Sequence, residues 1–108
     1  MSPISSDSVG TTTDIKADFQ RLAAEWKQDT AHLSSPEMIA AHRAYQEIIG
    51  MDKDAIPFIL QDLQKSPTQW FWALRSIAGE SPVRPEDRGD VDAMTTAWLD
   101  WGRRNLYI

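Results

Sequence analysis

The sequence predicts an all-α domain, and three features lead to this prediction. Apolar residues recur at helical spacing in five segments, each with a capping residue or a proline near its start. No segment shows the strict alternation of apolar and polar residues that indicates a half-buried strand. Four of the five tryptophans fall in two of these segments, at Trp70-Phe71-Trp72 and Trp98-Leu99-Asp100-Trp101. Tryptophan buries a large area and carries one N–H that needs a partner, so we expect both segments to anchor a core or a docking surface.

Length and composition fit a single folded domain. A chain of 108 residues removes roughly two thirds of its unfolded surface from water on folding. Its 42% of hydrophobic and 25% of charged residues are typical of globular proteins. Residues 1–12 differ, because they are rich in Ser and Thr and show no apolar periodicity. We therefore expect a disordered tail over 1–12 and one helical domain over 13–108.

Two helices are expected before residue 51. The first begins at Thr13 or Asp14, either of which can cap it, and ends near Thr30. Its apolar stripe consists of Ile15, Phe19, Leu22, Ala23 and Trp26. The second begins at Ser35-Pro36, a cap followed by proline in the first turn, and Gly50 provides a left-handed stop. Its apolar face contains Met38, His42, Tyr45 and Ile49, with Ile39 and Ile48 alongside.

Two more helices are expected between Asp52 and Gly79. The third is capped by Asp52 or Asp54, and Pro57 either forces its start close to Asp54 or weakens its first turn. Its apolar positions are Ile56, Ile59, Leu60 and Leu63. The segment Ser66-Pro67-Thr68-Gln69 has the pattern of a capping box and opens the fourth helix. This helix is apolar on more than one face, which indicates neighbours on two sides or a docking surface. Its apolar residues are Trp70, Phe71, Trp72, Ala73, Leu74 and Ile77.

The fifth helix follows an ordered loop. Residues 79–89 hold Pro82 and Pro85 among charged residues, a composition typical of loops. Asp90 then caps a helix with apolar residues at Val91, Met94, Trp98 and Trp101. Together the five segments predict a compact bundle of short helices.

Two parts of the chain resemble known helical proteins. The words Asp54-Ala-Ile-Pro-Phe-Ile-Leu-Gln-Asp-Leu and Trp72-Ala-Leu-Arg-Ser-Ile-Ala-Gly79 resemble the two helices of one HEAT-type repeat. No second copy is found, so the resemblance implies one HEAT-like hairpin and not a solenoid. From about Tyr45 to Gly102 the chain also resembles a group of short uncharacterised bacterial helical proteins. The shared words are Ile48-Ile-Gly-Met51, Trp70-Phe-Trp-Ala-Leu74 and Trp98-Leu-Asp-Trp-Gly102, and they carry over no activity.

Charge and residue usage narrow the classes of function. The formal net charge of −5 disfavours a nucleic-acid partner, because a phosphate backbone is repelled on average. Without cysteine the chain has no disulfide, no thiolate chemistry and no Cys-based metal site. The first residues lack a signal-peptide pattern, and no apolar run approaches the roughly 20 residues needed to span a bilayer. We therefore expect a cytoplasmic protein without a membrane partner.

The sequence offers no pattern for catalysis, a cofactor or a metal. His42 has no nucleophile or ligand near it in sequence, so a hydrogen-bonded position at the core boundary is preferred over a base or a pH switch. His32 is expected to complement a helix dipole, and it is not at metal-ligand spacing from His42. The acidic stretch 86–92 does not match a calcium loop and indicates a solvated helix start. We expect no enzyme activity, no cofactor and no metal.

Two regions remain as candidates for binding. One is a concentration of arginines, which consists of Arg84, Arg88, Arg103 and Arg104. Acidic residues lie close to them in sequence, which favours a solvated, salt-bridged surface over a nucleic-acid site. The other is Trp72, which projects away from the stripe that contains Trp70 and lies beside Arg75. Trp72 either packs against the last helix or serves as an exposed anchor for a partner.

The predicted function is therefore a non-enzymatic module that binds another protein through its helical surface. The partner-binding residues proposed from sequence are Trp72, Arg75, Arg103 and Arg104. The alternative is a small regulator of nucleic-acid transactions, antitoxin-like or transcription-associated, that uses the region from Arg84 to Arg104.

Overall fold

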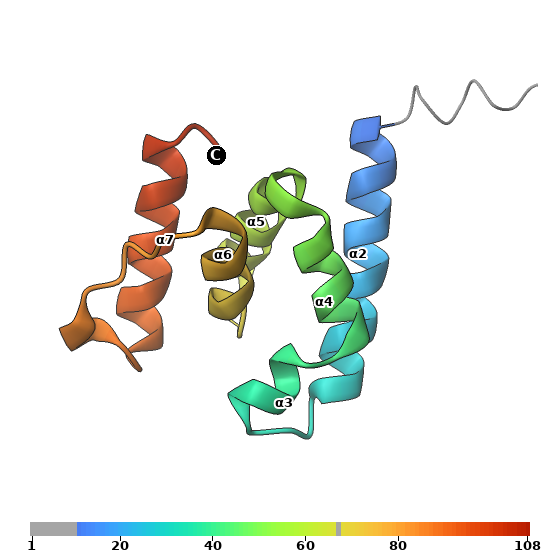
Figure 1. Cartoon of the computed structure of the whole chain (residues 1–108), viewed down its shortest axis with the longest axis horizontal. Coiled ribbons are helices and arrows are strands. Elements are labelled where there is room, and N and C mark those ends of the chain that lie inside the picture. The colour runs from blue at the N-terminus through green and yellow to red at the C-terminus, as the bar shows by residue number, and fades with distance from the viewer. Residues whose placement is uncertain (1–10, 67) are drawn as a thin grey trace, which may run out of the picture.

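The regular structure of the described part of the chain is helical (Figure 1). The computed structural model describes residues 11–66 and 68–108. Within these ranges it contains six α-helices, two short 3-10 helices and no strand, so the predicted all-α class is confirmed. None of these helices combines the length and the apolar character needed to cross a membrane. The tail expected over 1–12 lies outside the described residues up to residue 10, and residues 11 and 12 already belong to the first helix.

The helices stand in a row, with α2 at one end and α7 at the other (Figure 1). The elements in chain order are α2 (Thr11–Thr30), α3 (Pro36–Ala40), α4 (Arg43–Gly50), η1 (Asp52–Ala55), α5 (Ile56–Lys65), α6 (Phe71–Ala78), η2 (Pro85–Asp87) and α7 (Val91–Arg104). Helix α2 packs along α4, α4 packs on α6, and α5 contacts both α6 and α7. Helix α7 therefore rests on α5, away from α2.

The core on the α2 side is an aromatic cluster centred on Trp70, which is completely buried. The centroid of its indole lies 5.5 Å from the Phe19 ring, 4.5 Å from the Trp26 ring and 5.6 Å from the Tyr45 ring. Offset and tilted arrangements at such distances add to the free energy gained from burial. The cluster therefore joins α2 and α4 to the residue that immediately precedes α6.

The polar atoms of this cluster all find partners. Trp26 Nε1 donates to the carbonyl oxygen of Ile39 at 2.9 Å, which ties α3 to α2. The Tyr45 hydroxyl donates to the Gln69 carbonyl at 2.7 Å and accepts from the Ala73 N–H at 2.9 Å. Burial raises the pKa of the Tyr45 phenol well above its ordinary value, so the hydroxyl stays protonated and can keep both bonds.

The single helix expected over 35–50 is wrong, because the chain breaks at His42. His42 has extended backbone angles (φ −59°, ψ 138°), and its ring accepts a hydrogen bond from the Ala44 N–H as the cap of α4. The break changes which residues face inward: Met38, expected on the buried face, is 58% exposed. Gly50 is also not the left-handed stop, since it belongs to α4 and the positive φ of 60° falls on Asp52.

The capping box expected at Ser66 is wrong as well. Ser66 follows the last turn of α5 with extended backbone (φ −157°, ψ 107°), and α6 begins only at Phe71. A helix starting at Ser66 would engage the Gln69 carbonyl in its own ladder, whereas here that oxygen accepts from Tyr45. Tertiary hydrogen bonding and the burial of Trp70 therefore override the local signal.

Other helix ends follow the sequence rules in part. Gly79 closes α6 with a φ of 77°, a conformation that glycine adopts without strain. Asp90 caps α7 by accepting from the Ala93 N–H at 3.1 Å, as predicted. Neither Asp52 nor Asp54 caps α5, which continues directly from η1 and carries Pro57 in its first turn.

Helix α7 approaches α5 closely at Gly102. A Cβ atom added there would lie 2.5 Å from Leu60 Cδ1, and Leu60 is completely buried. Trp98 and Trp101, on the same side of α7, are 1% and 7% exposed. Trp101 also stacks on Tyr107 and donates from Nε1 to Glu80 Oε2 at 3.0 Å. The burial of two tryptophans thus fixes α7, and the absence of a side chain at Gly102 lets α7 approach α5 closely.

We expect Trp98→Ala to lower the free energy of unfolding by about 3–5 kcal/mol, because it empties a large buried site. Chemical denaturation of the purified variant measures this loss. Val91→Ala serves as the control, since Val91 lies on the same helix and is 41% exposed. A wild-type denaturation midpoint for Trp98→Ala would contradict the assigned packing.

We expect Gly102→Ala to destabilise the protein, although alanine favours a helix over glycine by up to about 1 kcal/mol. The clash with Leu60 costs about 1–3 kcal/mol and exceeds that gain. Gly50→Ala is the matched control, because no atom lies within 4 Å of its added carbon. Thermal unfolding should show a lower midpoint for Gly102→Ala alone, and an increase for Gly102→Ala would show that α7 yields easily.

Candidate functional site

An open groove lies between α6, the loop that follows it and α7. Its volume is about 450 Å³. The apolar part of its lining consists of Phe71, Trp72, Val83, Met94 and Trp98. The polar part consists of Gln69, Arg75, Gly79, Glu80, Ser81 and Arg88. The groove therefore combines an aromatic wall with both signs of charge.

Trp72 forms the exposed part of this aromatic wall. The buried face of α6 is made by Ala73, Leu74 and Ile77, and the helical rotation of 100° per residue turns Trp72 away from it. Its side chain is 58% exposed, so α7 does not cover it. Of the two alternatives for Trp72, the structure thus favours the exposed position.

Two arginines flank the apolar wall of the groove. Arg75 lies one turn after Trp72 on α6, and Arg88 follows η2. Among the described residues, no carboxylate forms an ion pair with either guanidinium. The carboxylate in the lining belongs to Glu80, and it accepts a hydrogen bond from Trp101.

The residues proposed from sequence separate into two pairs. Trp72 and Arg75 come together in the groove, as one candidate surface. Arg103 and Arg104 lie exposed in the last turn of α7 and do not line it. Arg104 pairs with Asp100 at 3.0 Å, which is the salt-bridged surface expected for this region.

Sequence reasoning missed the contribution of the loop and of Arg88. Arg88 was visible as one member of a basic concentration, but its place beside α6 depends on the path of residues 79–90. The left-handed turn at Gly79 starts that path, and Gly89, with a φ of 91°, lies near its end. Such a path is set by tertiary packing, so residue spacing alone does not show that Arg75 and Arg88 line the same groove.

A cluster of potential metal ligands lies elsewhere, between α2 and α4. The ligand atoms of Glu25, Asp29 and His42 all lie within 4.8 Å of one another. His42 Nδ1 accepts from the Ala44 N–H at 3.0 Å, so the network assigns the ring proton to Nε2, which lies 2.9 Å from Asp29 Oδ2. A metal on Nε2 would need that proton moved to Nδ1, where the backbone N–H already points.

The cluster therefore fits a capping network better than a metal centre. Arg43 adds to this reading, because its guanidinium lies 2.6 Å from Glu25 Oε2 and neutralises that carboxylate. His42 was expected on the apolar face of its helix, and this placement is wrong. Its hydrogen bonds to the backbone and to a neighbouring side chain agree with the boundary role that was preferred.

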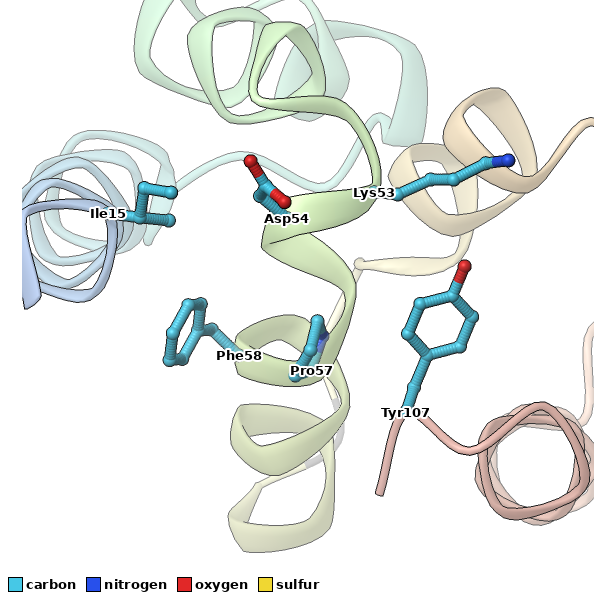
Figure 2. A pocket seen from close by; sticks show the side chains of 6 residues that line it. All are labelled: Ile15, Lys53, Asp54, Pro57, Phe58 and Tyr107. Atoms are coloured by element: carbon cyan, nitrogen blue, oxygen red, sulfur yellow. The ribbon is translucent and has the colours of Figure 1, made fainter. Parts of the chain in front are cut away.

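A smaller hollow of about 300 Å³ surrounds the junction of η1 with α5 (Figure 2). Figure 2 shows Ile15 and Phe58 on one side of this junction and Tyr107 on the other. Lys53 and Asp54 extend from the start of the junction, and their charged ends do not converge on a common point with the rings. The side chains are spread around the helix start, so they make no focused site for a small molecule.

We expect His42→Ala to lower the free energy of unfolding by about 1 kcal/mol through loss of the α4 cap. His42→Asn should retain most of the stability, since asparagine is a favourable cap residue. Urea denaturation of both variants measures the difference. An equal loss in both would show that the Asp29 contact, and not the cap, is what His42 contributes.

Similarity to known proteins adds no assignment for the groove. Comparison of the chain with protein-family models, with curated proteins and with solved structures gave no match. The HEAT-like hairpin and the bacterial group stay expectations from sequence. The chemistry of the groove itself is therefore what bears on function.

Proposed function

We propose that this chain is a non-enzymatic module that binds another protein through the groove between α6 and α7. The observation that carries the proposal is Trp72, an indole that is 58% exposed in a groove whose apolar lining also includes Phe71, Val83, Met94 and Trp98. Tryptophan and arginine are the residue types most enriched among those that dominate the free energy of protein association. Trp72 and Arg75 supply one of each on the same face of α6.

The surroundings of Trp72 support the same proposal. Trp98 gives the groove a rigid floor, because its side chain is buried against the core. Met94 lies beside it, and methionine adapts its shape to different partners. A rigid anchor with an adaptable neighbour suits the binding of an apolar side chain from outside.

A protein partner is better supported than the alternative of a nucleic-acid regulator. In the region from Arg84 to Arg104, Arg84 pairs with Asp87 and Arg104 pairs with Asp100. These carboxylates reduce the attraction for phosphates, and the chain carries a formal charge of −5. A chain without cysteine suits a reducing compartment, so we propose that the module is cytoplasmic. A bacterial source is proposed from the sequence resemblance alone.

The test compares Trp72→Ser with Met38→Ser, because both wild-type side chains are 58% exposed. Both variants should unfold within about 1 kcal/mol of the wild type, as is usual for exposed positions. Each immobilised protein is then incubated with lysate of the organism that encodes the chain, and captured proteins are quantified by mass spectrometry. We expect a specific partner that is retained by Met38→Ser and lost by Trp72→Ser.

Two results would contradict this proposal. If Trp72→Ser retains every partner of the wild type, the groove is not the binding surface. If Trp72→Ser loses stability like a core truncation, its indole is part of the fold and not an anchor. A purified partner allows the loss to be measured directly, and removal of a dominant anchor should cost about 2 kcal/mol of binding free energy or more.

A further inference from the structure

We infer that the groove between α6 and α7 selects an acidic, amphipathic segment of the partner protein. The segment places an apolar side chain beside Trp72, and its carboxylates pair with Arg75 and Arg88. This inference rests on the proposed function of the groove and adds the chemistry of the occupant. It follows from the distribution of unpaired positive charge in a chain whose net charge is −5.

Most arginines of this chain are already neutralised within it. Of the seven arginines, the four that pair with a carboxylate are Arg21, Arg43, Arg84 and Arg104. Across the part of the chain that the structure describes, the other three form no ion pair, and two of them line this groove. The groove therefore concentrates cationic charge that the fold itself does not use.

The sign of the local charge favours a carboxylate ligand. Glu80 also lines the groove, so the two arginines leave an excess of one positive charge. Glu80 is engaged with the indole N–H of Trp101, whereas both guanidinium groups keep their donors available. Guanidinium stays charged at any ordinary pH and binds carboxylates through two parallel hydrogen bonds. A basic segment would meet a net repulsion here.

The size of the groove favours a short segment. Helix α6 has eight residues and is therefore about 12 Å long, which is about two turns of a bound helix. The volume of about 450 Å³ is in the range of small-ligand pockets, so it accommodates a few side chains and not the face of a domain. Arg75 on α6 and Arg88 after η2 both line the groove together with its apolar side chains, so a segment with an apolar residue and neighbouring carboxylates can pair with both.

The probes are three fluorescein-labelled synthetic 12-residue peptides, titrated with the full chain and followed by fluorescence anisotropy. The first alternates Asp and Glu with leucines at helical spacing, the second replaces its acids by lysine, and the third replaces its leucines by serine. We expect the acidic apolar peptide to bind at least tenfold more tightly than either of the others. Its affinity should fall as salt is raised, because part of the attraction is screened.

Single charge reversals identify the groove as the binding site. Arg75→Glu and Arg88→Glu should each weaken the acidic peptide at least fivefold and strengthen the lysine peptide. Arg103→Glu is the matched control, because this substitution changes the net charge by the same amount. Arg103 also forms no ion pair among the described residues, and it lies outside the groove. Trp72→Ser should also weaken the acidic peptide at least tenfold.

Several outcomes would overturn the inference. The arginines do not select the ligand if the acidic and lysine peptides bind equally well, or if neither binds at concentrations up to about 1 mM. The same conclusion follows if Arg103→Glu weakens the acidic peptide as much as Arg75→Glu and Arg88→Glu do. Self-association of the chain in sedimentation velocity, weakened by Arg75→Glu, would assign the groove to a second copy. If these arms fail while Trp72→Ser still loses its cellular partner, the proposed function stands and only the acidic ligand is rejected.

Discussion

The hydrogen bond from Trp70 to Asp62 is the interaction on which the α2 side of the fold depends. A completely buried indole needs a partner for its N–H, and Asp62 Oδ2 supplies one at 2.7 Å. Lys27 Nζ lies 2.7 Å from the other oxygen of that carboxylate and compensates its charge. Residues from α2 and α5 thus meet at one indole, and around it the rings of Phe19, Trp26 and Tyr45 close the core.

Helical periodicity predicted most of the interior correctly, because inward-facing positions recur whatever the neighbours are. All four apolar positions expected in α5 are buried, as are Phe19, Leu22, Ala23 and Trp26 on α2. The errors fall where a side chain takes up a backbone group that a continuous helix would have bonded itself. The ring of His42 caps a new helix instead of extending one, and the Gln69 carbonyl accepts from Tyr45 instead of entering a helical ladder. The second exchange joins residues 24 apart in sequence, so local propensity could not reveal it.

The candidate site shows the same division between local and tertiary information. The direction of Trp72 follows from helix geometry, and so does its proximity to Arg75 on the same helix. Its exposure does not, since it depends on α7 resting against α5 and leaving the outer face of α6 open. The place of Arg88 depends on an eleven-residue connection, over 79–89, that crosses from one helix to the next. For a candidate surface composed of several elements, the sequence therefore predicts the part on each helix but not how these parts come together.

The close approach at Gly102 has a consequence for the distant end of α7. Met94, which lines the groove, precedes Gly102 by eight residues and is therefore about 12 Å away along the helix. The separation of two packed helices is set by the side chains at their contact, so a methyl group at position 102 would lift α7 from α5. Because α7 is rigid, that displacement would reach Met94 and alter the width of the opening beside Trp72. The width of this opening is thus fixed partly by the single hydrogen atom that Gly102 carries in place of a side chain, at a position outside the groove.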